Sequence, residues 1–481
     1  MQVISNKIEK SAAIVVMGLL LIAVPFLLFS DSYALAFMAL LAPIGALITF
    51  LCIRKPLNGL YVFIVISVFA FYPSRILGKD LPINTGLEVL LLCLLIGTLF
   101  HTRNEKVSSF LKTPISIMFF IFSIFLCLQV FNPNMQSVPG WLFCMRRYIM
   151  LVFYYIIAYK LINSFEKFKF YIKFWVVIVF IICLYGYYQQ FFGLFDFEMR
   201  DLMKNPKDFQ LAMQGGLLRK QSFLADMIIY GVICGGMSLF TLILGLNETR
   251  RKRQILFFFL FGFFWVGMNF SGTRTLVVML PAGVALYSLM TIGNRKTLLV
   301  IFSTILLFLF ILYAPIYSNP TLNRMRTAFD KDNASNNVRD WNRSYIQPYI
   351  YKHPIGGGVL TCGEPGRRFN PSHPLAGFPP DSGFLQSALE LGWVGYGLYI
   401  LFYIVILYQG ITFYFASKHK EIKKYILAIV IMNFGILLVQ YSQVSEGQIP
   451  NTILIYSSFA LLTRLREFDS ERTAKRLLDN A

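Results

Sequence analysis

The sequence contains little charge and even less acid. Only 14% of its 481 residues are charged, and 44 lysines and arginines stand against 24 aspartates and glutamates, which gives a formal net charge of +20. With 57% hydrophobic residues and a mean hydropathy of +0.62, a water-soluble chain would expose apolar surface that it could not bury, whereas a bilayer accepts such surface. These proportions exclude a soluble globular enzyme and indicate a protein that crosses a membrane many times.

Several familiar motifs are also missing. The seven cysteines contain no CxxC pair and lie mostly inside apolar runs, so neither a structural disulfide nor a metal site is predicted. The glycine-rich segment HPIGGGV, residues 353–359, lacks the GKS or GKT ending of a phosphate loop. Basic residues form short clusters between apolar runs rather than one stripe or tail, which argues against nucleic acid as a partner.

About fourteen apolar runs are long enough to cross roughly 30 Å of hydrocarbon at about 1.5 Å per residue. They are residues 12–29, 33–53, 57–71, 87–100, 114–131, 148–162, 170–192, 223–246, 255–270, 276–292, 298–316, 384–408, 425–441 and 452–462. The first run has a basic start and no small-residue cleavage site, and a second run follows directly. It is therefore predicted to be an anchor rather than a signal peptide.

Lysines and arginines gather at alternate ends of these runs, so the positive-inside rule predicts an even number of spans and two cytoplasmic termini. The long segment 193–222 is then extracytoplasmic. We predict an all-α polytopic membrane protein with eleven helices in residues 1–316, an extracytoplasmic catalytic loop at 317–383, three helices in residues 384–463 and a cytoplasmic tail at 464–481.

Four arginines in the outer segments are candidates for binding phosphate. Arg219 in GGLLRKQSF precedes the eighth span, and Arg274 in NFSGTRT lies between two adjacent spans. Arg339 and Arg343 in NNVRDWNRSY lie in the long loop. A guanidinium keeps its charge and its planar fork matches two phosphate oxygens, so several at one membrane level predict a pyrophosphate clamp. Alternatively, each arginine extends to the interface or pairs with a nearby aspartate.

Asp381 in GFPPDSGFLQSALEL stands at the start of the twelfth span. A carboxylate there, facing arginines, could take a proton from an attacking hydroxyl. Equally, Asp381 or Ser382 could simply cap the helix. His373 is the alternative base, His353 is expected to cap the end of the preceding helix, and Glu390 inside the span is a candidate supporting residue because a charge there is expensive.

The segment HPIGGGV, residues 353–359, follows a predicted amphipathic helix at 341–351. Glycines at 356–358 permit a close backbone approach or a turn with positive φ. A tight turn is the favoured interpretation.

Four segments in this order, RKQSF, SGTRT, NNVRDWNRSYIQPYIYKHPIGGGV and PPDSGFLQSALELGWVGYGLYI, resemble the bacterial O-antigen ligase and polymerase family over roughly residues 219–400. The resemblance implies a C-type glycosyltransferase of the bacterial cytoplasmic membrane that needs no cofactor, metal or nucleotide sugar. Its partners would be undecaprenyl-pyrophosphate-linked oligosaccharide, membrane lipids and other polysaccharide export proteins. Arg219, Arg274 and Arg339 match family arginines that hold pyrophosphate. Asp381-Ser382 replaces the His-Asn pair of the family's ligases, which looks more like a polymerase.

The expected function is therefore a polymerase of surface polysaccharide that transfers glycan from undecaprenyl pyrophosphate to a sugar hydroxyl on a lipid-linked repeat unit. An O-antigen ligase differs only in its acceptor, which is lipid A core or protein. A lipid-linked oligosaccharide flippase is the third possibility, but the sequence shows no inverted repeat and few charges at mid-membrane.

Overall fold

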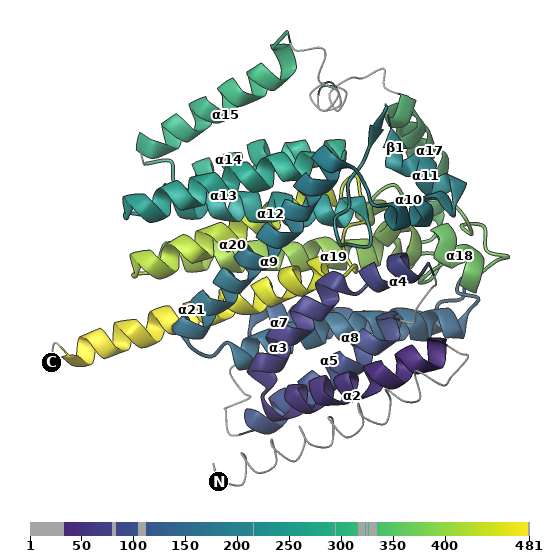
Figure 1. The fold of residues 1–481 in the computed structure, drawn as a ribbon, viewed down its shortest axis with the longest axis horizontal. Coiled ribbons are helices and arrows are strands. Elements are labelled where there is room, and N and C mark those ends of the chain that lie inside the picture. The colour runs from purple at the N-terminus through teal and green to yellow at the C-terminus, as the bar shows by residue number, and fades with distance from the viewer. Residues whose placement is uncertain are drawn as a thin grey trace. The chain divides into compact units, whose positions relative to one another are not determined.

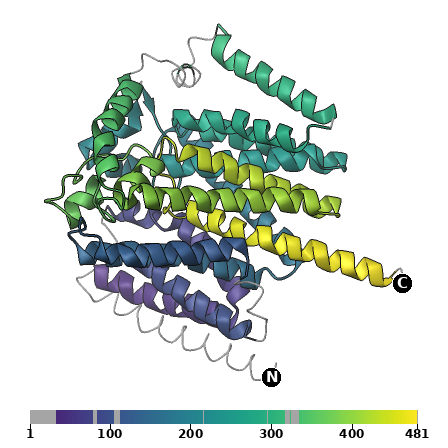
Figure 2. The same cartoon turned by 180° about the vertical axis from the view of Figure 1, so that it is seen from behind.

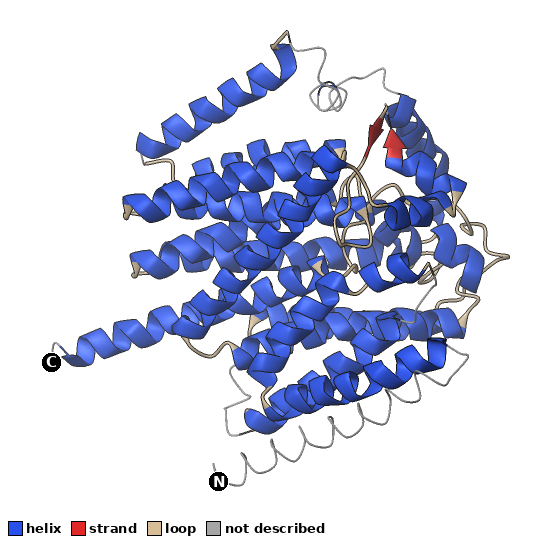
Figure 3. Cartoon of the chain, in the orientation of Figure 1, coloured by secondary structure: helices blue, strands red, loops and turns tan. Residues whose placement is uncertain are grey.

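The computed structural model describes residues 33–78, 83–103, 112–214, 216–293, 295–315, 323, 326 and 334–479. Most of these residues are helical (Figure 3), and the remainder form connecting loops and one short antiparallel pair of strands. Strand β1 (Met213–Gln214) pairs with β2 (Leu217–Leu218), with Met213 opposite Leu218. The protein is thus an all-α polytopic membrane protein, as predicted. The predicted first span, residues 12–29, lies outside the described residues.

The chain divides into two compact units, the first of which comprises residues 1–67 and 82–105. It contains α2 (Tyr33–Arg54), most of α3 (Pro56–Phe69) and α5 (Ile83–His101). Helices α2 and α5 pack backbone to backbone at Gly97, where an added Cβ would lie 2.3 Å from the carbonyl oxygen of Cys52. Only glycine allows this close approach, which is how helices commonly associate in membranes.

The second unit comprises residues 68–81 and 106–481. Its elements are α4 (Tyr72–Leu77), α7 (Pro114–Leu128), η1 (Gln129–Phe131), α8 (Val138–Leu161), α9 (Phe165–Phe192), α10 (Asp196–Met203), α11 (Pro206–Ala212), α12 (Met227–Leu246), α13 (Arg251–Asn269), η2 (Arg274–Val278), α14 (Met279–Met290), α15 (Arg295–Tyr313), α17 (Ala334–Lys352), α18 (Gly363–Phe369), α19 (Gly383–Ala416), α20 (Lys420–Val439) and α21 (Asn451–Asp479). Helix α12 lies at its centre and packs against α13 and α20 (Figure 1).

Every predicted apolar run from residue 33 onward overlaps one of these helices. Within the described residues, eight helices are long and apolar enough to cross a membrane, and three shorter apolar helices accompany them. Helices α10, α11, α17 and α18 are shorter or more polar, and they gather with the β-hairpin at one end of the long helices of the second unit (Figures 1 and 2). This end contains the described parts of both segments predicted to be extracytoplasmic, residues 193–222 and 317–383.

Helix α19 is interrupted at Gly392, which has a φ of 69° and a ψ of −178°. The break leaves carbonyl groups without their usual donors, and the predicted glycine turn supplies replacements. The N–H of Gly357 donates to Leu389 O, and the N–H of Gly358 donates to Glu390 O, both at 2.9 Å. Val394, which would bond to Glu390 in an unbroken helix, donates to a carbonyl of the turn instead. The turn therefore completes the hydrogen bonding of a broken membrane helix.

A small apolar core fixes the polar end of the second unit onto α19. Ile346 of α17 is buried together with Cys362, Leu375 and Leu389. Because Leu389 belongs to the first part of α19, this core links α17 to the helix that begins at the candidate site.

Candidate functional site

A polar cavity of about 770 Å³ opens at this end of the second unit. Its charged lining residues come from seven separate elements or loops and are equally divided between basic and acidic. They are Arg75, Arg219, Arg274, Arg339, Asp201, Asp208, Asp226 and Asp381. Three arginines and the carboxylate that the sequence singled out therefore lie around one space, although up to 162 positions separate them in the sequence.

Arg219 is held rigidly between two segments. Its Nε donates to Ser271 O at 2.8 Å, Nη1 to Leu211 O at 3.1 Å and Nη2 to Thr273 Oγ1 at 2.9 Å. Gly272 must be glycine here, because its φ is 61° and an added Cβ would lie 2.7 Å from Arg219 Cγ. Burial lowers the pKa of Arg219, but a guanidinium remains charged near neutral pH.

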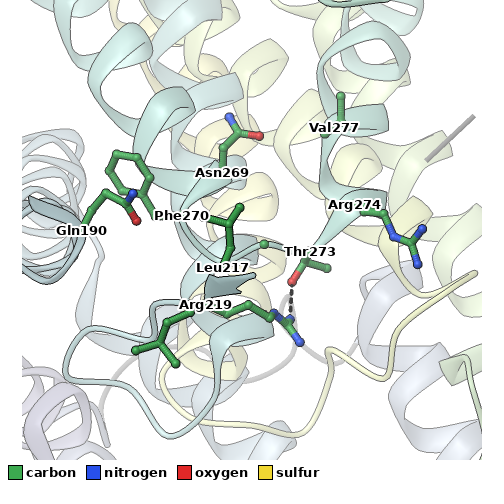
Figure 4. Close-up of a pocket in the computed structure, with 10 residues that line it drawn as sticks. Gln190, Leu217, Arg219, Asn269, Phe270, Thr273, Arg274 and Val277 are labelled. Atoms are coloured by element: carbon green, nitrogen blue, oxygen red, sulfur yellow. Dashed lines mark hydrogen bonds between the residues drawn. The ribbon is translucent and has the colours of Figure 1, made fainter. Parts of the chain in front are cut away.

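Arg274 follows directly on the turn that Arg219 anchors. Figure 4 shows a smaller pocket beside the cavity, in which Arg219 reaches Thr273 while the side chain of Arg274 extends away from the same turn. Arg219 is therefore placed to orient the turn, and Arg274 is placed to reach into the larger cavity.

Arg274 and Arg339 face the cavity as a pair of like charges. Burial and then the positive charge of Arg339 lower the pKa of Arg274. Within the part of the chain that the structure describes, Arg339 has no carboxylate at ion-pair distance. Two neighbouring guanidinium groups repel each other, and a bound anion would relieve that repulsion. The pair is suited to a phosphate or pyrophosphate group.

At the start of α19, the structure shows which of Asp381 and Ser382 caps the helix. Ser382 is the N-cap, and its Oγ accepts the N–H of Leu385 at 2.9 Å. Asp381 lies just outside the helix, lines the cavity and receives a long hydrogen bond of 3.4 Å from Asn342 Nδ2. Because Ser382 caps the helix, the carboxylate of Asp381 remains a candidate base.

The loop between α20 and α21 holds the backbone next to Asp381 in place. The N–H of Gly383 donates to Gln440 O at 2.9 Å and to Gln443 O at 3.2 Å. A Cβ on Gly383 would lie 2.3 Å from Gln440 Oε1, so only glycine permits this approach. Gln443 itself lines the cavity.

Two of the other three aspartates have structural partners. Asp226 caps α12 by accepting the N–H of Ile228, and Asp201 forms an ion pair of 2.7 Å with Lys204. Asp208 lies exposed on α11. Asp381 is thus the carboxylate that lines the same cavity as Arg274 and Arg339 and does not cap a helix.

Arg75 is a cavity residue that the sequence did not single out. It is only 6% exposed, and it donates to the carbonyl oxygens of Ser222, at 2.9 Å, and Leu224. These bonds hold the loop before α12. In the sequence, Arg75 is an arginine in a short outer segment between apolar runs, and such a position by itself indicates only membrane topology.

Arg343 does not line this cavity. Its guanidinium donates to the hydroxyl and the carbonyl oxygen of Tyr441 at 3.0 and 3.1 Å and lies 4.6 Å from the ring centroid. Asp340 is 3.9 Å away. These contacts give Arg343 a structural role in attaching α17 to the end of α20.

The two predicted histidines lie together behind the glycine turn. His353 stacks on Tyr349 with centroids 4.0 Å apart, and its Nδ1 is 2.8 Å from Tyr349 O at the end of α17. His373 is buried, and its Nδ1 accepts the N–H of Leu375. Burial and then the charge of His353 lower the pKa of His373. Neither lines the arginine cavity, and Glu390 lines a different one.

Residues 255–400 match a family model described as O-antigen ligase. The match includes Arg274, Arg339 and Asp381, whereas Arg219 precedes it. No curated protein matches the chain. The family match confirms the resemblance seen in the sequence and, together with the many apolar helices, supports a multi-pass membrane enzyme of surface-polysaccharide synthesis.

Proposed function

We propose that this membrane protein is a polymerase of surface polysaccharide. Its residues 255–400 match the family model described as O-antigen ligase. In this proposal it transfers a glycan from undecaprenyl pyrophosphate to a sugar hydroxyl of another lipid-linked repeat unit. The observation that supports it is the meeting of Arg274, Arg339 and Asp381 around one polar cavity at the start of α19.

The reaction needs one bond formed, one bond broken and one proton moved. The acceptor oxygen attacks the anomeric carbon, and the bond from that carbon to the pyrophosphate oxygen breaks. Pyrophosphate leaves with the bonding electrons, and Arg274 and Arg339 stabilise its charge. Asp381 takes the proton of the attacking hydroxyl as a general base. Attack opposite to the leaving group inverts the anomeric carbon, which linkage analysis of donor and product can verify.

Neighbouring residues hold Arg274 and Asp381 in position. Arg219 orients the turn before Arg274, and Asn342 contacts the carboxylate of Asp381. Holding the two substrates in line accounts for a large share of catalysis in a transfer of this kind, since pyrophosphate is already a good leaving group. The polymerase is preferred over a ligase because Asp381-Ser382 stands where the resembled ligases carry a His-Asn pair.

The test is the length distribution of lipid-linked glycan on a gel. Cells that lack the protein receive wild type, Arg339→Ala, Asp381→Asn or Arg343→Ala. Arg343 is the matched control, because it lies one turn further along α17 and outside the cavity. We expect the first two variants to reduce the ladder to a single repeat unit at normal protein level, and Arg343→Ala to retain it.

Two other outcomes decide against this function. An intact ladder that stays on its lipid carrier in the deletion strain would identify a ligase. A normal ladder with both Arg339→Ala and Asp381→Asn would remove the arginine cavity from the chemistry altogether.

A further inference from the structure

A second cavity of about 240 Å³ lies within the second unit, and the proposed chemistry leaves it unused. It is bounded by α7, α8, α19, α21, the end of the glycine turn and the α20–α21 loop. The α20–α21 loop is common to both cavities, because it contributes Gln443 to the arginine cavity and Glu446 to the second cavity. Helix α19 begins two residues after Asp381, which lines the arginine cavity, and contributes Gln386 to the second cavity.

Aromatic side chains form a substantial part of the wall of this second cavity. They include Phe119, Phe122, Tyr148, Phe402 and Tyr456. A sugar ring presents C–H groups on its faces and hydroxyls at its edge, so flat apolar walls suit its faces. The remaining requirement is a set of polar groups at the edge.

Glu446 provides an incomplete polar contact of this kind. Its Oε2 accepts a hydrogen bond of 2.8 Å from the hydroxyl of Tyr399. Its Oε1 is buried and has no hydrogen-bond partner among the described residues. A buried acceptor without a donor is costly, and a ligand hydroxyl in the cavity would supply the missing donor.

Further polar groups surround the same space. Glu390, which is 7% exposed, accepts hydrogen bonds from Cys362 Sγ at 2.9 Å and Gln386 Nε2 at 3.4 Å. Arg147 donates to Gly447 O at 3.0 Å. The cavity therefore offers carboxylate acceptors, an amide and a guanidinium between aromatic faces.

We propose that this second cavity binds the terminal sugar of the acceptor glycan. The inference rests on the proposed transferase function and assigns the acceptor subsite within it. A prenyl chain would gain nothing from two carboxyl groups in hydrocarbon surroundings. The volume is smaller than that of pockets for drug-sized ligands, which fits one saccharide residue. Asp381 precedes the helix that lines the cavity, so the base lies next to the acceptor side.

The experiment uses the full-length protein in lipid nanodiscs. The probe is the repeat-unit oligosaccharide released by mild acid from the lipid carrier of the producing cells. Binding is measured by saturation-transfer NMR, and initial transfer rates are measured against probe concentration at saturating lipid-linked donor. Variants are Glu446→Gln, Tyr399→Phe and Gln386→Met, with Glu471→Gln as control because Glu471 is exposed on the far part of α21.

We expect Glu446→Gln and Gln386→Met each to raise the KM for the oligosaccharide by a few-fold, up to about tenfold, as the loss of one hydrogen bond does, and to change kcat much less. Asp381→Asn should abolish transfer and retain binding. Unchanged binding in all three cavity variants would overturn the acceptor site while leaving the transferase intact. Full transfer by Asp381→Asn and Arg339→Ala would instead overturn the proposed function, and the NMR signal would still test the saccharide site.

Discussion

Two adjacent side chains at the start of α19 have different tasks. Ser382 has an extended backbone, with φ −147° and ψ 152°, and caps the helix, whereas Asp381 lies one residue earlier and faces the cavity. Aspartate and serine are both preferred N-caps, so the sequence PPDS left both assignments open. The path of the backbone decides between them. Asp381 can therefore exchange a proton without loss of the helix cap.

Glu446 makes the stability of the fold depend on pH. Burial raises the pKa of Glu446 from 4.5 to about 7, and the hydrogen bond from Tyr399 opposes part of that rise. The folded protein then holds this proton more tightly than the unfolded chain does. Stability therefore falls as the pH rises through the interval from 4.5 to about 7 and stays lowered above it. The full effect is up to about 3 kcal/mol, at about 1.4 kcal/mol per pKa unit.

Thermal unfolding in nanodiscs at about pH 5 and about pH 8 checks this expectation. The wild type should have the lower Tm at the higher pH, and Glu446→Gln should narrow the difference. The other charged and titratable groups that line this cavity are unchanged in that variant, namely Cys144, Arg147, Tyr148, Glu390, Tyr399 and Tyr456. An identical pH dependence in the two proteins would show that the Glu446 carboxyl is not the group responsible.

Helix α19 illustrates where a sequence pattern stops being informative. The run LELGWVGYGLYI is continuously apolar apart from one glutamate, and it predicts an unbroken helix. The break at Gly392 arises from amides of the turn at 356–358, which compete for the carbonyls of Leu389 and Glu390. No local feature distinguishes Gly392 from Gly397 in the sequence, although only the first has a positive φ.

This contrast gives a matched pair of substitutions. In Gly392→Ala the new Cβ would lie 2.1 Å from Pro354 O at a φ of 69°, whereas at Gly397 nothing lies within 4 Å. We expect Gly392→Ala to lower the free energy of unfolding by more than the roughly 1–2 kcal/mol of a left-handed residue, because the clash adds to it. Gly397→Ala, in a regular helix, should be neutral or slightly stabilising. Equal Tm values for the two variants would contradict the interrupted helix.

The distribution of charge along the chain predicts which end of the second unit faces outward. The arginine cavity and the segment after α17 should be extracytoplasmic, and the end of α21 should be cytoplasmic. A membrane-impermeant maleimide should therefore label Ser372→Cys in intact cells and should label Glu471→Cys only after lysis; both positions are exposed. The unmodified protein, with its seven native cysteines, provides the background. The reverse pattern would place the cavity on the wrong side for an extracytoplasmic transferase.

Much of this arrangement could be predicted from the sequence because length and hydrophobicity decide which segments span a membrane. The same reasoning predicted that Arg219, Arg274, Arg339 and Asp381 lie at one level of the membrane. In the structure they line one cavity. Arg75 was missed because its partners are backbone carbonyls far along the chain. The second cavity was missed because Glu446 lies in a short loop without a recognisable motif.

The interruption of α19 also couples the glycine turn to both parts of one span. Leu389 and Glu390, before the break, accept hydrogen bonds from the turn, and Val394, beyond the break, donates to Pro354 O of the same turn. The turn therefore bridges the break at Gly392, so neither part of α19 can shift without moving the segment that connects α17 to α18.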